Sequence, residues 1–195
     1  MNDILNNNLF LVKEHVGLLK AANNYDIYDP SSQRIILECR EEHLGLFTRL
    51  LRFSDFKRMT PFDISIKTPD GKLVLRVKRG ISILLSKVEV LDENLQTIGH
   101  FQQKLFSIGG AFSVMDAQNR PRCYLKGTWT GWNFKFLSGD RELAHVSKKW
   151  AGLGKELLTS ADNYVLEISS AVPAGDTVRK LILAAVMCID MVLKE

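Results

Sequence analysis

The sequence predicts a mainly β protein, a closed antiparallel barrel of about twelve strands around a buried hydrophobic C-terminal helix. Three observations support this fold class. Short runs of alternating apolar and polar residues recur between turn signals at roughly 8–12-residue intervals, a spacing typical of antiparallel sandwiches and barrels. The alternation of strands and helices that marks a parallel sheet is absent. One long apolar run stands at the end of the chain, at Leu181–Leu193.

Each expected strand is bounded by residues that close turns. The clearest example is Phe62–Lys67, which the turn Thr68–Gly71 joins to a second alternating run at Lys72–Arg79. Aspartates begin several of these turns because their side chains accept hydrogen bonds from nearby backbone N–H groups. The other expected strands are Leu9–Lys13, Tyr25–Asp29, Arg34–Arg40, Leu85–Leu91, Gln96–Phe101, Phe112–Met115, Arg122–Gly127, Trp132–Leu137, Glu142–Ser147 and Tyr164–Ile168.

The chain has 195 residues, which is about the length of one domain. We expect residues 1–8 to form a disordered polar tail and residues 9–195 to form a single barrel domain. Within that domain, Glu42–Phe53 places its apolar residues at helical spacing, which predicts a short helix or an irregular crossing.

The terminal run, expected as a helix over about 177–193, is apolar on every side and contains Asp190. It is shorter than the roughly 20 apolar residues that span a bilayer. Two interpretations follow: a helix enclosed by the rest of the protein, or a short membrane anchor. A barrel of about twelve strands has an interior too wide for side chains alone to fill, which favours the enclosed helix. The expected core-helix residues are Leu181, Ile182, Leu183, Val186, Ile189, Asp190 and Val192.

Composition excludes some classes of function and leaves others open. The net charge of +4 favours anionic partners, either phospholipid or nucleic acid. Three widely spaced cysteines and the absence of a signal peptide or lipidation motif predict a reduced, cytoplasmic protein, with peripheral attachment to membranes as one option. Isolated histidines and the lack of a nucleophile motif predict no enzyme activity, no metal and no cofactor. Aromatic-basic RNA motifs are missing, so we expect no nucleic-acid partner.

Basic clusters are the remaining candidates for a binding site. In Lys72–Arg79, strand alternation places Lys72, Arg76 and Lys78 on one face and the leucines and Val77 on the other. Basic faces of this kind can hold anionic headgroups, at about 1 kcal/mol per charge near a charged membrane. A solvated barrel exterior is the alternative interpretation, as wall packing is for the tryptophans. The candidate lipid-binding residues are Arg76, Lys78, Arg79, Lys148, Lys149 and Trp150.

Several segments resemble a known family. The most specific are Ala144–Gly152, which reads Ala-His-Val-Ser-Lys-Lys-Trp-Ala-Gly, then Lys155-Glu156, Ala161–Tyr164 and Ile189–Met191. Over roughly residues 9–195 the chain resembles the phospholipid scramblases and the LURP-one-related proteins, which have a tubby-like fold. The resemblance implies a closed barrel around a core helix, binding of anionic phospholipid at a membrane surface, and a part in transbilayer lipid movement. The alternative that it implies is a non-catalytic, LURP-one-like interaction barrel.

The chain departs from the scramblase pattern in three features: the calcium loop, the cysteine cluster and the proline-rich leader, which is not found in this sequence. The proposed calcium loop of the family would begin at Ser160 and end at Ala171, with Val165 at the glycine position. Of the acidic residues at the ligand positions of the loop, only Asp162 remains. Because Ca²⁺ requires six or more oxygen ligands, we expect no calcium binding here. The cysteine cluster for palmitoylation is also missing after Arg79, so we expect no acyl anchor.

Overall fold

The structure is a computed structural model that describes most of the chain. The described residues are 3–15, 22, 24–41, 45, 48, 60–81, 87–103, 112–128, 132–148 and 163–193, without the side chains of residues 103, 128 and 190–193. The helix expected over Glu42–Phe53 lies almost wholly outside this set.

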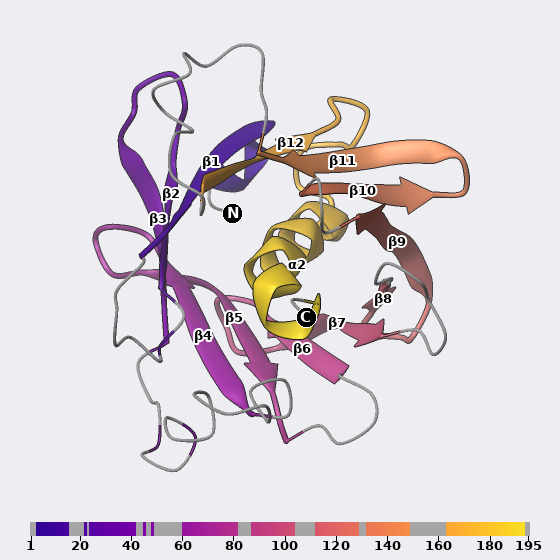
Figure 1. Cartoon of the computed structure of the whole chain (residues 1–195), viewed down its shortest axis with the longest axis horizontal. Helices are drawn as coiled ribbons and strands as arrows, with labels where there is room; N and C mark the ends of the chain where they lie inside the picture. Colours follow the sequence, from indigo (N-terminus) through magenta and orange to yellow (C-terminus); the bar gives the residue numbers. More distant parts are fainter. Residues whose placement is uncertain are drawn as a thin grey trace.

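Twelve antiparallel strands form a closed barrel, which confirms the predicted fold class (Figure 1). Each strand pairs with its neighbours in sequence, and β1 pairs with both β2 and β12, so the ring closes without an edge. The strands are β1 (Leu9–Glu14), β2 (Tyr25–Tyr28), β3 (Ile35–Arg40), β4 (Phe62–Lys67), β5 (Leu73–Arg79), β6 (Lys87–Leu91), β7 (Thr97–Gln103), β8 (Phe112–Asp116), β9 (Pro121–Thr128), β10 (Asn133–Ser138), β11 (Arg141–Ser147) and β12 (Asn163–Ile168).

The alternation in the sequence becomes the two faces of the wall. In β4, Phe62, Ile64 and Ile66 are buried, whereas the residues between them are partly exposed. The pleat of a strand sends successive side chains to opposite faces, so the apolar set fills the interior and the polar set faces outward.

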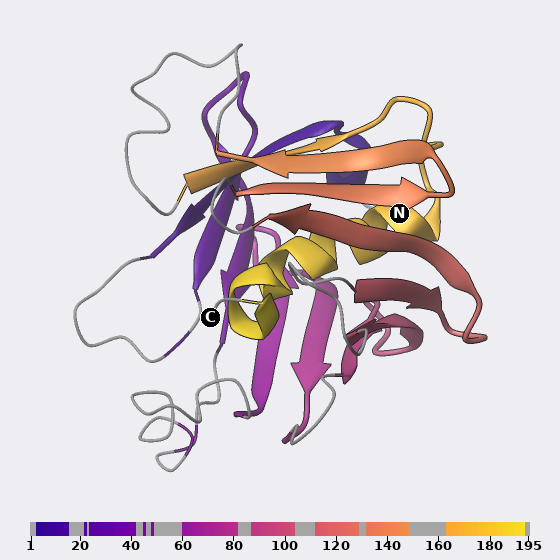
Figure 2. The same ribbon diagram turned by 45° about the vertical axis from the view of Figure 1, so that its right-hand side comes forward.

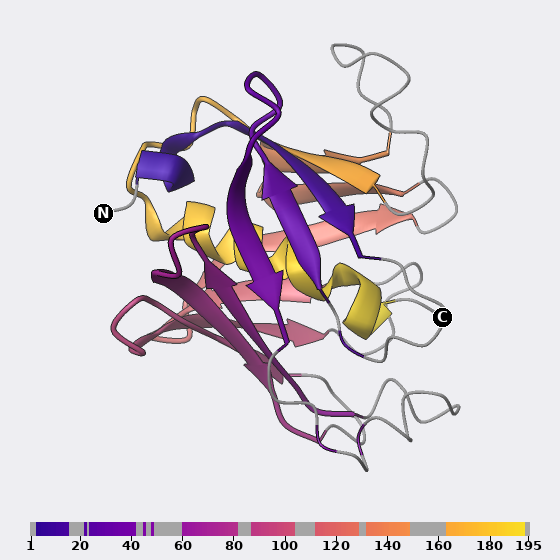
Figure 3. The same cartoon turned by 90° about the vertical axis from the view of Figure 1, so that its left-hand side faces the viewer.

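The two ends of the barrel differ in how the strands are connected. We call the turn end the one that holds the short turns after β2, β4, β6, β8 and β10 and the segment from β12 to the helix. We call the far end the opposite one, where the connections after β1, β3, β5, β7, β9 and β11 leave the wall. The N-terminal segment lies at the turn end and the C-terminus at the far end (Figure 3).

The C-terminal helix α2 (Thr177–Leu193) runs inside the ring of strands from the turn end to the far end (Figure 2). Every residue from Leu181 to Ile189 is buried, on all sides of the helix. Full burial of each large aliphatic side chain contributes about 1.5–3 kcal/mol, so α2 is the principal element of the core. Among the described residues, no helix has the length and hydropathy needed to cross a bilayer.

The expectation that the N-terminal residues form a disordered tail is wrong for residues 3–8. Asp3–Asn6 is a 3₁₀ helix, η1, and Leu5 belongs to the core cluster. The buried guanidinium of Arg179 in α2 fastens this segment by donating hydrogen bonds to the carbonyl oxygens of Leu5, Asn6 and Asn7 and to Oδ1 of Asn8, at 2.6–3.1 Å. The polar sequence of this segment suggested disorder. Its order could not be inferred locally, because Arg179, the partner of its backbone groups, lies more than 170 residues away.

One glycine sets how closely α2 approaches the wall. A Cβ at Gly99 in β7 would lie 2.9 Å from Cδ2 of Leu181 and 2.3 Å from the carbonyl oxygen of Met115. We therefore expect Gly99→Ala to lower the free energy of unfolding by about 2–4 kcal/mol, measured by urea denaturation, because helix and wall must separate. Gly80→Ala is the control, since a Cβ there meets nothing within 4 Å. An equal effect of both substitutions would contradict this packing.

Candidate functional site

The basic face predicted on β5 exists, but an acidic residue on β4 partly neutralises it. Arg76 forms a two-pronged ion pair with Asp63, with both N–O distances at 2.8 Å, and Nζ of Lys78 lies 3.6 Å from the same carboxylate. The adjacent Lys72 pairs with Asp70 at 3.1 Å. These side chains are partly to largely exposed, so the face carries a reduced positive charge rather than a strong cationic patch.

The expectation that Arg79 contributes to a surface site is wrong. Arg79 is in phase with Leu75 and Val77, so its side chain points inward and is only 4% exposed. Its Nη2 donates to the carbonyl oxygen of Thr60 at 2.6 Å, and the guanidinium lies over the ring of Phe62 at 4.7 Å. A buried guanidinium needs such acceptors, so Arg79 stabilises the far end of the barrel from within.

Lys148 lies at the far end, directly after β11, and contacts an aromatic cluster that the sequence did not reveal. Its ammonium lies 4.3 Å from the ring centroid of Trp132. The indole stacks on Tyr164 at 5.5 Å and meets Phe134 edge-on at 6.2 Å. Trp132 has a positive φ of 46°, which is unusual for an aromatic residue and places it outside β10. Strand periodicity alone assigned Trp132 to the strand and therefore missed the cluster.

The other predicted site residues divide into described and undescribed ones. Lys149, Trp150, Ser160 and Asp162 lie outside the described residues, as do the side chains of Asp190 and Val192. The remaining core-helix residues are all buried: Leu181, Ile182, Leu183, Val186 and Ile189.

Half of the segment considered as a calcium loop, Asn163–Ile168, is strand β12. Val165 is buried in β12, which pairs with β1 on one side and β11 on the other. The carbonyl oxygen of Ala171 accepts a hydrogen bond from Arg141. A strand paired on both sides is extended and cannot wrap its oxygens around an ion. This geometry supports the expectation that calcium does not bind here, which stays a prediction.

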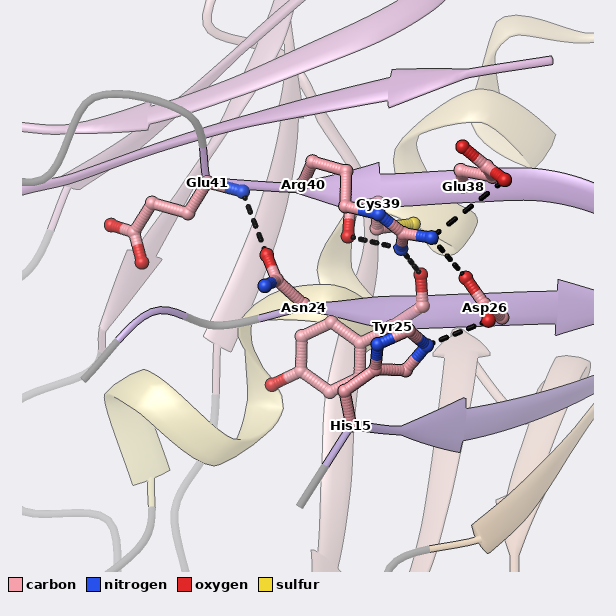
Figure 4. A network of polar contacts seen from close by, with 8 residues as sticks. All are labelled: His15, Asn24, Tyr25, Asp26, Glu38, Cys39, Arg40 and Glu41. Carbon is pink, nitrogen blue, oxygen red and sulfur yellow. Dashed lines mark hydrogen bonds and ion pairs between the residues drawn. The ribbon is translucent and has the colours of Figure 1, made fainter. Parts of the chain in front are cut away.

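A second polar group at the far end joins β1, β2 and β3 (Figure 4). Asp26 accepts from Arg40 at 2.6 Å and contacts Nε2 of His15 at 2.6 Å. The same guanidinium donates to the carbonyl oxygens of Tyr25 at 2.7 Å and Cys39 at 3.1 Å. The group holds the ends of β2 and β3 together, and its carboxylate offsets its guanidinium, so it is a structural network rather than a cationic site.

All three cysteines are buried in the barrel. Burial raises the pKa of the Cys123 thiol to about 12, and it raises the pKa values of Cys39 and Cys188 well above the usual range. The thiolate is the reactive form, so these side chains act as small hydrophobic residues and not as nucleophiles.

A sequence comparison decides the family. The model of a family described as Scramblase matches residues 10–195, which is nearly the whole barrel. The chain belongs to the scramblase family. The match includes the strands of the wall and the axial helix, so the fold described above is the family domain of this protein.

A comparison of folds agrees with the closed-barrel architecture. A crystal structure of a protein from Arabidopsis thaliana superposes with a TM-score of 0.55 at 14% sequence identity, over 93% of this scramblase-family chain and 90% of the other. At this level of identity the similarity concerns the fold alone.

Proposed function

We propose that this scramblase-family protein binds anionic phospholipid at a membrane surface, with the far end of the barrel toward the bilayer. Family membership supports a role with phospholipids. Any contribution to transbilayer lipid movement would depend on this binding step. The proposed activity is binding, for which the protein needs no catalytic group.

The observation that carries the proposal is the difference in composition between the connections at the two ends. The connections at the turn end are mainly polar, with Leu95 as an exposed aliphatic exception; examples are Asp29–Ser32, Thr68–Gly71, Asp92–Asn94 and Ser138–Asp140. The connections at the far end are rich in large apolar residues and include all three tryptophans of the chain. Tryptophan and aliphatic residues next to basic ones are typical of surfaces that enter the membrane interface. The apolar segments are Leu44–Phe47, Leu50–Phe53, Ile81–Leu85 and Leu105–Ile108.

Two described side chains at the far end fit this orientation. Ile81, two residues after the end of β5, is 77% exposed, which is unusual for so large an aliphatic side chain. Lys148, which is partly exposed, holds its charge over the indole of Trp132, 4.3 Å from the ring centroid, so a cation and an aromatic ring lie together at this end. Insertion of Ile81 into lipid would recover about 1.5–3 kcal/mol, and each lysine near an anionic surface adds about 1 kcal/mol.

Two exposed aliphatic residues provide a matched test of this orientation. Ile81 lies at the far end and Leu95, which is 50% exposed, lies in the β6–β7 turn at the turn end. In co-sedimentation with phosphatidylserine-containing vesicles, we expect Ile81→Asp to weaken binding at least about tenfold, because it removes an apolar anchor and adds a repelled charge. We expect Leu95→Asp to bind like the unmodified protein.

Salt and lipid charge separate the proposal from its alternative. Binding should require anionic lipid and should weaken as ionic strength rises, since salt screens exposed charges. At a fixed ionic strength, Lys148→Glu should weaken binding to anionic vesicles, because it replaces an attracted charge with a repelled one. Binding to neutral and anionic vesicles at the same low level would contradict the proposal and would favour the non-catalytic interaction barrel.

A further inference from the structure

The turn end holds a cluster of arginines that the proposed membrane orientation does not use. Arg120 and Arg122 flank Pro121, the first residue of β9, and Arg141 begins β11. All three line one cleft of about 500 Å³, together with residues of the segment that leads into α2. Arg120 and Arg122 also line an adjoining cleft of about 260 Å³. A cleft of about 500 Å³ falls within the range of volumes of small-molecule sites.

The charge of this arginine cleft is not balanced by its own acidic residues. Its carboxylates are Asp116, which pairs with Arg120 at 2.8 Å, and Asp176, which pairs with Arg122 at 3.1 Å. Arg141 has an uncharged partner instead: its Nη2 donates to the carbonyl oxygen of Ala171 at 2.5 Å. Three guanidinium groups against two carboxylates leave one net positive charge in the cleft.

A second cleft at the turn end gives a comparison. It also measures about 500 Å³, but its two lysines are each matched by a carboxylate: Lys72 with Asp70 at 3.1 Å and Lys180 with Glu93 at 3.0 Å. Excess positive charge therefore distinguishes the arginine cleft from its neighbour of equal size.

Hydrogen-bond donors remain for a ligand in the arginine cleft. A guanidinium has five N–H groups. Within the part of the chain that the structure describes, Arg122 and Arg141 each use only Nη2 for hydrogen bonds, which leaves Nε and Nη1 of both side chains. The N-terminus of α2 is not the binding group, because the Asp176 carboxylate already accepts from the backbone N–H of Val178 at 2.9 Å.

We propose that the arginine cleft binds a small soluble anion that carries phosphate groups. Planar guanidinium groups match the oxygens of phosphate in pairs, and a phosphate of two negative charges suits a cleft with three arginines better than a single carboxylate does. The connections that border the cleft, at 117–120, 139–140 and 169–176, contain one large aliphatic residue, Val172, and its side chain is buried. They therefore present no aliphatic anchor for insertion into lipid, which favours a soluble ligand over a phospholipid headgroup. This site does not rest on the proposed membrane binding, since it lies at the opposite end of the barrel.

Isothermal titration with inorganic pyrophosphate tests the site on the full chain. We expect saturable binding that Arg141→Gln weakens about tenfold, which is the effect of one lost charge-assisted hydrogen bond. Arg141 is the better first variant because Arg122 also pairs with the residue that caps α2. Arg34→Gln is the matched control, since Arg34 is exposed at the same end and lines neither arginine-bearing cleft. Arg141→Lys, which keeps the charge, should recover part of the affinity.

Several results would overturn the assignment. These are the absence of saturable pyrophosphate binding, an equal loss of affinity in Arg34→Gln, or unchanged affinity in Arg141→Gln with an unchanged thermal midpoint.

Vesicles that contain a phosphorylated phosphatidylinositol distinguish the source of the phosphate. If Arg141→Gln abolishes binding to these vesicles while pyrophosphate does not bind, the soluble-ligand assignment is wrong. The supporting result is unchanged binding of Arg141→Gln to phosphatidylserine vesicles with weakened binding of pyrophosphate.

Discussion

Val186→Asp will prevent the barrel from folding. Val186 is in the middle of α2 and 1% exposed, and every residue around the helix axis from Leu181 to Ile189 is buried. An unpaired carboxylate there costs several kcal/mol, and the lost aliphatic contacts add to that cost. The sum approaches the whole free energy of unfolding of an ordinary domain, about 5–15 kcal/mol. Circular dichroism and gel filtration should show an unfolded or aggregated chain.

A conservative substitution at the same position gives the control. Val186→Ala removes two methyl groups without adding charge, so we expect a folded protein that is less stable by about 1–3 kcal/mol. A monomeric Val186→Asp protein with cooperative unfolding near that of the unmodified chain would contradict the enclosed position of α2. Such a result would favour a surface or membrane helix for residues 177–193 instead.

Arg179→Met will produce the second large loss of stability. The guanidinium is 3% exposed and donates to five oxygen acceptors: those in residues 5–8 and the carbonyl oxygen of Val172. Methionine has a similar length but donates no hydrogen bond, so buried acceptors lose their partner. We expect the free energy of unfolding to fall by about 3–5 kcal/mol in urea denaturation.

Hydrogen exchange shows where this stability is lost. In Arg179→Met, amides of residues 3–8 should exchange much faster than in the unmodified protein, because the segment loses its attachment to α2. Arg34→Met, at an exposed arginine of the β2–β3 turn, should change neither quantity. If both substitutions have the same small effect, the N-terminal segment is not held in this way.

The fold could be predicted from the sequence because its cues are local. Alternation in β4 and β5 and the turn between them specify a hairpin wherever they occur in a chain. The enclosed helix followed from an apolar surface on all sides combined with the number of strands. The order of residues 3–8 could not be predicted in this way, because it depends on Arg179 at the other end of the chain.

The candidate site was harder to predict because ion pairs and side-chain orientation are set by neighbouring strands. Asp63 is separated from Arg76 by a turn, and only the register of β4 against β5 shows that it offsets the basic face. Strand alternation with Leu75 and Val77 already predicts that Arg79 points inward. Its positive charge, however, suggested a residue on the surface. Trp132 directly precedes β10 and stacks on Tyr164 of β12, and these two strands are not adjacent in the wall.

Site-specific fluorescence tests the proposed orientation on the membrane most directly. Because the three native cysteines are buried with raised thiol pKa values, a cysteine introduced at an exposed position should react selectively with an environment-sensitive dye. We predict that the dye on Ile81→Cys shifts to the blue with anionic vesicles and is quenched by lipid-borne quenchers, whereas the dye on Leu95→Cys is unchanged. A shift at position 95 alone, or at neither position, would contradict the account.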